Sequence, residues 1–275
     1  MSSNAVASRY VPQPSLFVPH GAPTFALRPG AAGAALAQEA ASLPSPRAVI
    51  IVSAHWETAV PAVGFAARPQ TIHDFWGFPA ELNLIRYSAS GCAEASAEVL
   101  AALQHAGFNA ASDATRGLDH GAWIPLRLMF PDAEIPVIPL SIQTALGPLH
   151  HLALGRALAP LAARGFLVIG SGNLTHNLRD FQVAYRSGGK TPAYVREFAD
   201  WMWQRIEAGD VPALLDYRRR APDGARAHPT EDHLLPLYVA LGAAGDRARS
   251  ARIHAGVDDY VLAMDAFSFN PQAEV

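Results

Sequence analysis

Histidine is the residue type through which this sequence could do chemistry, because eleven of its 275 residues are histidine and several follow apolar runs. His20 follows a predicted strand in VPHGAP, His55 follows another in VSAHWE, and His176 follows a third, after a glycine-rich turn, in VIGSGNLTH. In open α/β sheets, ligands bind beyond the carboxyl ends of the strands. We therefore expect these three imidazoles to converge on one site, although a single histidine after a strand is more often a hydrogen-bonded structural residue.

Two further histidines lie in the segment HPTEDHLLPLYVALGAAG. His233 opens a predicted helix, and Leu237 and Leu241 follow it at positions four and eight, on the same face. That apolar face must pack inward, so we expect His233 to point into the protein. His228 precedes Pro229, which disfavours helical backbone at the residue before it, so we expect His228 in an extended loop at the rim of a pocket. The alternative for both is a packing role near the helix start.

The segments GLDHGAWIPL and TIHDFWGFP contain the remaining candidates. His120 lies between Gly117 and Gly121, which indicates tight turns near a site, although an ordinary loop histidine is the alternative. The stretch from His73 through Trp76 to residue 78 is predicted to form part of a lid or a pocket wall. A surface loop with a buried aromatic anchor is equally compatible with it.

Neutral imidazole is a common nitrogen ligand of iron, zinc and copper, and three protein ligands with open positions are typical of a catalytic metal site. Other histidines beside the metal could act as general acid or base. The sequence contains no P-loop, no GxGxxG after a strand, no HExxH and no CxxC. Ser171, between Gly170 and Gly172, lacks the pattern of a nucleophile elbow. Cys92 is the only cysteine, so no internal disulfide forms, and a surface or cap role is expected for it.

The alternation of apolar runs with alanine- and leucine-rich stretches predicts an α/β layered fold, with a mostly buried central sheet flanked by helices and the metal site at the C-terminal ends of strands. We expect one catalytic domain over residues 15–270, a flexible segment over 1–14 and a tail over 271–275. The expected strands are 15–18, 48–53, 135–141, 166–170 and 260–263, and the expected helices are 30–42, 94–105, 123–129, 149–163, 194–208 and 233–243.

Composition excludes several other functional classes. Half of the residues are hydrophobic and 16% are charged, which is typical of a folded globule rather than a disordered chain. A formal net charge of −3 gives no footprint for nucleic acid. No apolar run reaches the length of a membrane span, and the N-terminus lacks a secretory signal. We expect a cytoplasmic protein that has no membrane or nucleic-acid partner and that can form a homodimer.

Seven motifs in order resemble the 4,5-DOPA dioxygenase family of the class III extradiol ring-cleavage dioxygenases, to which the catalytic chain of protocatechuate 4,5-dioxygenase is distantly related. The resemblance runs from Ser15 to Phe267. Each motif alone is weakly specific, but their order is highly specific. The motifs are VPHGAP, IIVSAHWE, TIHDFWGFP, GLDHGAWIPL, IPVIPLSIQ, GSGNLTHNL and HPTEDHLLPLYVALGAA.

The resemblance implies roles for individual residues. His20 and His55 match the two histidine ligands of the family, and His176 matches its acid–base catalyst. His120 matches a histidine that contacts substrate or dioxygen, and His233 occupies the place where the distant relatives carry a ligating glutamate. The implied cofactor is Fe(II), with Zn(II) able to occupy the site in purified protein, and the implied partners are a small aromatic diol and dioxygen.

The third ligand is a departure from the usual set of two histidines and one carboxylate on Fe(II). We expect His233 to take this position, with Glu231 and His228 as alternatives. A site of three histidines carries one more positive charge and would bind a catecholate more strongly. His228, His73 and Trp76 are the residues we assign to substrate binding.

The predicted activity is extradiol opening of a DOPA-like or otherwise substituted catechol. A metal that holds both catechol oxygens lowers their pKa, His176 accepts a phenolic proton, and His120 hydrogen-bonds dioxygen. Two other readings stay open at this point. One is a zinc-dependent hydrolase that uses the same histidines to activate water, and the other is a non-enzymatic binding protein with a vestigial site.

Overall fold

The central strands of the protein consist largely of aliphatic residues that are buried on both faces of a sheet. The structure is a computed structural model that describes residues 10–246 and 248–271. In β2 (Ala48–Glu57), Val49 and Ile51 join the core beneath α1 and α3, whereas Ile50 and Val52 join the core beneath α2 and α4. This alternation follows from the two-residue period of a strand, and burial on both faces is typical of parallel sheets.

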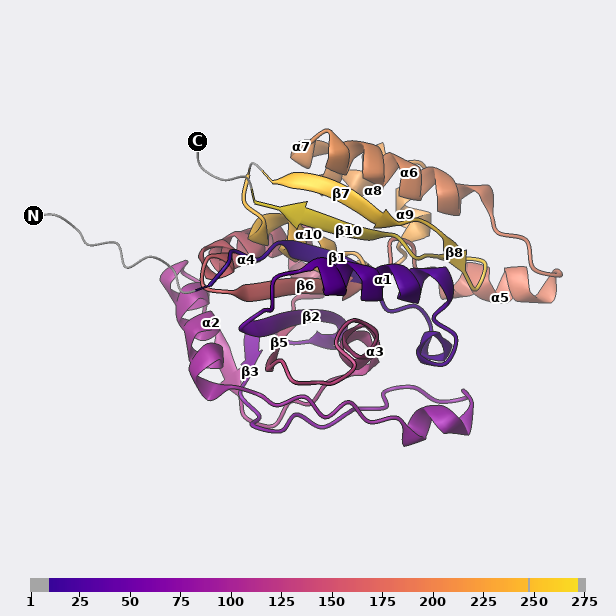
Figure 1. The fold of residues 1–275 in the computed structure, drawn as a ribbon. Helices are drawn as coiled ribbons and strands as arrows, with labels where there is room; N and C mark the ends of the chain where they lie inside the picture. Colours follow the sequence, from indigo (N-terminus) through magenta and orange to yellow (C-terminus); the bar gives the residue numbers. More distant parts are fainter. Residues whose placement is uncertain (1–9, 247, 272–275) are drawn as a thin grey trace, which may run out of the picture.

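The sheet has eight strands in the order β4-β3-β5-β2-β6-β1-β10-β7 (Figure 1). Strands β5, β2, β6 and β1 are parallel to one another, and β10 and β7 extend the sheet antiparallel beyond β1. A separate hairpin pairs β8 with β9. The remaining strand bounds are β1 Ser15–Pro19, β3 Ala62–Gly64, β4 Ala111–Asp113, β5 Val137–Ile142, β6 Phe166–Gly172, β7 Arg249–His254, β8 Val257–Asp258, β9 Leu262–Ala263 and β10 Ala266–Asn270.

Helices cover both faces of this sheet, as Figure 1 shows for α1 and α3 on the near side. Behind it, α4 packs against α10, and α10 also packs against β6. The α-helices are α1 Gly30–Ser42, α2 Ala93–His105, α3 His120–Met129, α4 Gly147–Ala162, α5 Leu178–Arg186, α6 Ala193–Glu207, α7 Val211–Leu215, α8 Tyr217–Arg220, α9 Gly224–Ala227 and α10 Leu235–Ala243. Short 3-10 helices are η1 Pro23–Ala26, η2 Ala80–Leu84 and η3 Thr144–Leu146.

Two glycines of β6 allow the chain that leads into α10 to lie directly on the strand. A Cβ atom at Gly172 would lie 2.0 Å from the carbonyl oxygen of His233, and one at Gly170 would lie 2.1 Å from that of Pro236. Neither distance is possible for a real side chain, so only glycine permits this approach. The glycines around Ser171 therefore position the His233 segment, which is a packing role distinct from a nucleophile elbow.

Three candidate histidines lie in elements that differ from those predicted. His55 lies within β2, because the strand continues to Glu57 through an irregular register after Val52. His120 is the first residue of α3 and not a loop residue, because the Asp119 side chain accepts a hydrogen bond from a backbone N–H of the first turn and so begins the helix.

His233 lies in a turn that precedes α10, so the prediction that it belongs to the first turn of the helix is wrong. The helix begins at Leu235, with Pro236 at its start, where a missing N–H costs nothing. His233 nevertheless points inward and is 4% exposed.

The layered α/β fold with a buried sheet is as predicted, and the bounds of α1 and α2 agree within one residue. Strands β3, β4, β7, β8 and β10 and helices α5, α7, α8 and α9 were not predicted. Of the segment expected to be flexible, residues 1–9 lie outside the described chain, while Gln13 is buried and donates its backbone N–H to Ala162. Residues 272–275 of the expected tail also lie outside it. Within the described chain, no helix is both long and apolar enough to cross a membrane.

Candidate metal centre

His20, His55 and His233 meet at the ends of neighbouring strands. His20 follows β1, His55 lies near the end of β2, and His233 lies over the end of β6, the strand between them. One ring nitrogen from each residue lies within 4.8 Å of the others, and the Nε2 atoms of His20 and His55 are 3.1 Å apart. Three residues that are distant in sequence thus present their donors to one point.

The second nitrogen of two of these rings is held by a hydrogen bond. His20 Nδ1 lies 3.0 Å from the Ser171 hydroxyl, which itself donates to the carbonyl of Gly121 and therefore accepts from His20. His233 Nδ1 donates to the Asp232 carboxylate at 2.5 Å. These partners assign the proton to Nδ1 in both rings, which leaves the Nε2 lone pairs free for a ligand.

This arrangement fits a divalent metal ion. The Nε2 atoms of His20 and His55 face each other across 3.1 Å, and His20 Nε2 carries no proton because Nδ1 of that ring donates to Ser171. Donors that surround a metal tetrahedrally at about 2.0–2.1 Å lie roughly 3.3 Å apart, close to the spacing seen here. The donor set is also chemically suitable, since neutral imidazole binds iron and zinc.

Burial keeps the rings of the cluster neutral. It lowers the pKa of His20 and His233 well below the usual value, and the neighbouring histidines lower both further. The pKa of His55 falls to about 4, mainly through burial. Neutral rings are the form that binds metal, so the cluster is ready for a ligand near neutral pH.

Asp74 and His120 form the next part of the site. His120 lies with its ring centroid 4.0 Å from that of His55, and its Nδ1 and backbone N–H both donate to Asp74 at 3.0 Å. The other oxygen of Asp74 lies 3.7 Å from His55 Nδ1. Burial alone would raise the pKa of Asp74, but the hydrogen bonds from His120 outweigh it and lower the pKa to about 2. Asp74 therefore links the two rings as a carboxylate.

His176 lies against the cluster with its ring stacked on that of His233, with the ring centroids 3.5 Å apart and the planes at 5°. Its side chain is partly exposed. Across the described residues, no hydrogen bond engages either of its ring nitrogens. Burial lowers its pKa to about 4, so the ring is neutral and free to accept a proton.

Two residues of the HPTEDH segment are turned away from the cluster. His228 is fully buried, so the predicted position at a pocket rim is wrong. Its Nε2 lies 2.9 Å from the carbonyl oxygen of Leu174, and its ring packs against Phe198 and Tyr217, which makes it part of the core. Glu231 accepts a hydrogen bond from the Tyr217 hydroxyl at 2.9 Å and does not join the cluster.

His73 is partly buried and Trp76 is exposed, although both belong to the HDFWGF stretch. His73 contacts the carbonyl oxygen of Ile85 through Nε2 and lies against the ring of Trp123. Trp76 is 88% exposed and lines a cavity of about 450 Å³ together with residues from η1, α5 and β9. The sequence predicted a pocket wall here, and the structure places Trp76 and Phe78 in one.

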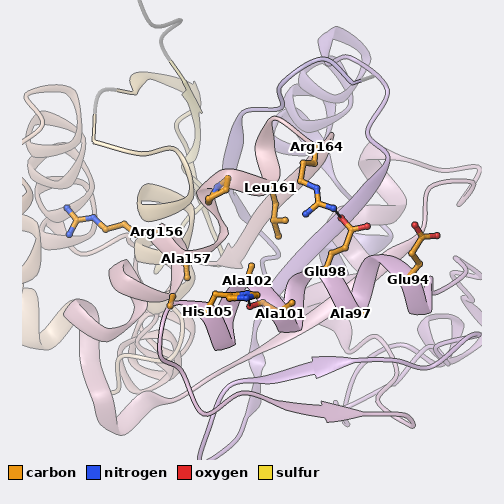
Figure 2. Close-up of a pocket in the computed structure, with 12 residues that line it drawn as sticks. Glu94, Ala97, Glu98, Ala101, Ala102, His105, Arg156, Ala157, Leu161 and Arg164 are labelled. Atoms are coloured by element: carbon orange, nitrogen blue, oxygen red, sulfur yellow. Dashed lines mark hydrogen bonds and ion pairs between the residues drawn. The ribbon is translucent and has the colours of Figure 1, made fainter. Parts of the chain in front are cut away.

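A larger hollow of about 740 Å³ lies elsewhere, between α2 and α4, and Figure 2 shows it. Alanines such as Ala97, Ala101 and Ala157 form much of its wall, and its charged residues form surface ion pairs, as Glu98 does with Arg164. It contains none of the cluster histidines and has no group arranged for catalysis.

The sequence motifs did not identify Asp74, Asp232 or Ser171 as parts of the site. Two of them had a signal, since each carboxylate follows or precedes a candidate histidine in the same motif. The glycines on either side of Ser171 pointed only to a nucleophile elbow, whose full pattern is absent. Its hydroxyl instead orients His20, as described above.

A family model described as the catalytic LigB subunit of aromatic ring-opening dioxygenase matches residues 30–261. The chain belongs to this family. The LigB-family chain is 38% identical to the 4,5-DOPA dioxygenase extradiol of Beta vulgaris over 93% of its own length and 96% of that protein. It is 36% identical to that of Mirabilis jalapa, covering 86% and 88% of the two chains.

The crystal structure of an uncharacterized Escherichia coli K12 protein shares the fold, with a TM-score of 0.76 and 26% identity over 93% of this chain and 99% of that one. These relatives confirm the predicted family, and this LigB-family protein is an extradiol ring-cleaving dioxygenase. They give no support to a zinc hydrolase or to a non-enzymatic binding protein.

Proposed function

We propose that this dioxygenase opens the ring of a substituted catechol at a non-haem Fe(II) ion held by His20, His55 and His233. The observation that carries the proposal is the convergence of three imidazole donors whose other nitrogens are tied to Ser171 and Asp232 or face Asp74. Iron would supply binding positions for both catechol oxygens and for dioxygen, and the redox chemistry that zinc lacks.

The chain's own residues would transfer the proton and orient the reacting groups. His176 is unpaired and partly exposed beside His233, so it would accept the proton of a phenolic oxygen and return it as the ring opens. His120 donates through Nδ1 to Asp74, which leaves its Nε2 available for a contact with dioxygen or substrate. Asp74 fixes that orientation and Asp232 fixes that of His233.

The cavity near the site is mostly apolar. Trp76, Phe78 and Phe181 line the cavity of about 450 Å³, a size within the usual range for small-molecule sites. Apolar walls suit the aromatic ring of a catechol and exclude water from the reacting groups.

Metal reconstitution tests this proposal. The protein is stripped with a chelator, loaded anaerobically with Fe(II) or Zn(II), and assayed with 4-methylcatechol in an oxygen electrode. Fe(II) should restore oxygen consumption and a yellow ring-opened product, whereas Zn(II) should restore neither, since zinc cannot activate dioxygen. Full activity with zinc alone would overturn the proposal.

A further inference from the structure

The cavity of about 450 Å³ is lined by residues that lie close in sequence to two histidines of the site. Ala22, which lines it, lies two residues after His20, and Leu178, on another wall, lies two residues after His176. A substrate whose catechol oxygens face the cluster would therefore extend its side chain into this cavity. The residues that line it are in the right place to select substrates by that side chain.

Two opposite charges lie on the wall of this cavity. Arg28 comes from the segment after η1, and Asp259 comes from the turn between β8 and β9. Within the described chain, no hydrogen bond or ion pair engages either side chain. Arg28 is close enough to Asp259 to lower the pKa of that carboxyl, which burial and Asp258 raise. Both groups are thus near each other and free to bind a ligand.

The turn that carries Asp259 is held in an unusual backbone conformation. Asp259 and Tyr260 have φ angles of 47° and 65°, in the left-handed region that residues with side chains rarely adopt. The Tyr260 ring packs over Gly189, where a Cβ atom would lie 2.5 Å from the ring. Strained backbone that persists is often found at ligand-binding sites. Here it fixes the turn that presents Asp259 to the cavity.

The charges of Arg28 and Asp259 together favour one kind of substrate side chain. An anionic tail would be attracted by Arg28 and repelled by Asp259, and a cationic tail would experience the reverse. A tail with both a carboxylate and an ammonium satisfies both groups. We propose that Arg28 and Asp259 form a two-charge subsite that determines side-chain specificity, with Arg28 binding a carboxylate and Asp259 an ammonium. This inference rests on the proposed function of catechol ring opening.

Three catechols that differ only in the tail test the subsite in the Fe(II)-loaded enzyme. They are L-DOPA, with both charges, 3-(3,4-dihydroxyphenyl)propionate, with the carboxylate alone, and dopamine, with the ammonium alone. Asp259→Asn should lower the kcat/KM ratio of L-DOPA to the propionate by about fivefold to tenfold, since one charge-assisted hydrogen bond is lost. Arg28→Gln should lower the ratio of L-DOPA to dopamine by a similar factor.

Asp258→Asn is the matched control, because Asp258 lies in the same hairpin and carries the same charge but does not line this cavity; it lines a neighbouring hollow together with Arg28 and Asp259. It should leave both ratios within about twofold of the wild-type values, a limit well below the loss expected for one hydrogen bond. Anaerobic calorimetric titration of the metal-loaded protein with L-DOPA gives a second readout, in which Asp259→Asn and Arg28→Gln should each weaken binding.

Three outcomes would overturn the inference. Unchanged ratios and L-DOPA affinities in both variants would show that neither charge contacts the tail. An equal shift with Asp258→Asn would indicate the general field of the hairpin and not the subsite. Wild-type protein that opens none of the three catechols would overturn the proposed function and this inference with it, whereas the first two results would leave ring opening intact.

Discussion

Among single residues, the proposed ligand set consists of three imidazoles, and carboxylates lie nearby. Asp232 accepts from His233 Nδ1, and Asp74 lies 3.7 Å from His55 Nδ1. A carboxylate partner fixes the tautomer of a ligating histidine and makes it a stronger donor. Two negative charges one ring away therefore offset the positive charge that a site of three neutral imidazoles would otherwise leave on the metal.

The two histidines of the HPTEDH segment have different expected roles: His233 is a proposed metal ligand, and His228 is a core residue. His233→Ala should lose bound metal, because one of three donors disappears. His228→Ala should keep the metal but lower the free energy of unfolding by about 2–4 kcal/mol, because it removes a buried ring. Metal content by atomic spectroscopy and urea unfolding check both. Metal loss in His228→Ala with retention in His233→Ala would contradict the proposed ligand set.

Asp74 is expected to act through His120. Asp74→Asn should leave the metal content unchanged and lower kcat/KM by about 10- to 100-fold, the usual effect of removing a partner of an active-site histidine. Asp132→Asn, at an exposed carboxylate with no part in the site, is the control and should match the wild type. If Asp74→Asn emptied the site, Asp74 would have to be treated as a metal ligand, together with His55 and His120.

Among the helices and strands, the features that depend on local sequence pattern could be predicted. The bounds of α1 follow from its alanine-rich run, and the core of β2 follows from its aliphatic run. The positions of His55 and His233 relative to their elements could not be predicted. An irregular strand register and the exact start of a helix depend on packing against other segments, which no local pattern records.

In the site too, the features that depend on contacts between distant segments could not be predicted. The convergence of histidines could be argued from strand ends, because parallel strands bring their carboxyl ends to one edge. The hydrogen bonds that orient them join distant residues, as Ser171 with His20 and Asp74 with His120. His228 was misplaced for a related reason, since its burial depends on α6 and α8 packing around it.

Gly172 links strand β6 to the site. Gly172→Ala should push the backbone of His233 away from the strand, weaken metal affinity by at least about tenfold and lower stability, because the added methyl overlaps a carbonyl oxygen. Ile169→Val, in the same strand, is the control. It should cost about 0.5–1.5 kcal/mol of stability while metal affinity stays unchanged. Equal metal affinity in Gly172→Ala would show that the glycine only serves packing.

At the scale of the whole molecule, the strand order decides where the chemistry lies. Strands β2, β6 and β1 are neighbours in the sheet although they are far apart in sequence, and they bring together His55, Ser171 and His20. Loops beyond the same edge add His176 and Asp74. This arrangement buries titratable rings: His20 and His228 are wholly inaccessible to solvent, and His233 is nearly so.

Buried neutral histidines couple folding to pH. Burial lowers the pKa of His55, His176 and His228 to about 4. In the unfolded chain the value is about 6.5. Above pH 6.5 both states are unprotonated and the full stability is present. As pH falls from 6.5 towards 4 the unfolded chain takes up protons that the folded protein does not, so the metal-free protein must lose stability across this window.

His151 lies outside the metal centre, so it allows the pH dependence of stability to be tested without changing a proposed ligand. Its Nε2 accepts from the backbone N–H of Gln143 and its Nδ1 contacts the Gly147 carbonyl oxygen, so the ring is fixed as the neutral form, and burial lowers its pKa to about 4. Each such histidine lowers the free energy of unfolding by up to about 1.4 kcal/mol for each pH unit that the pH falls between 6.5 and 4. Urea unfolding of metal-free His151→Gln at pH 5, 6 and 7 should therefore show a shallower loss of stability than the wild type. His105→Gln, at the exposed end of α2, is the control. A slope for His151→Gln equal to that of the wild type would show that the ring accepts protons equally in both states.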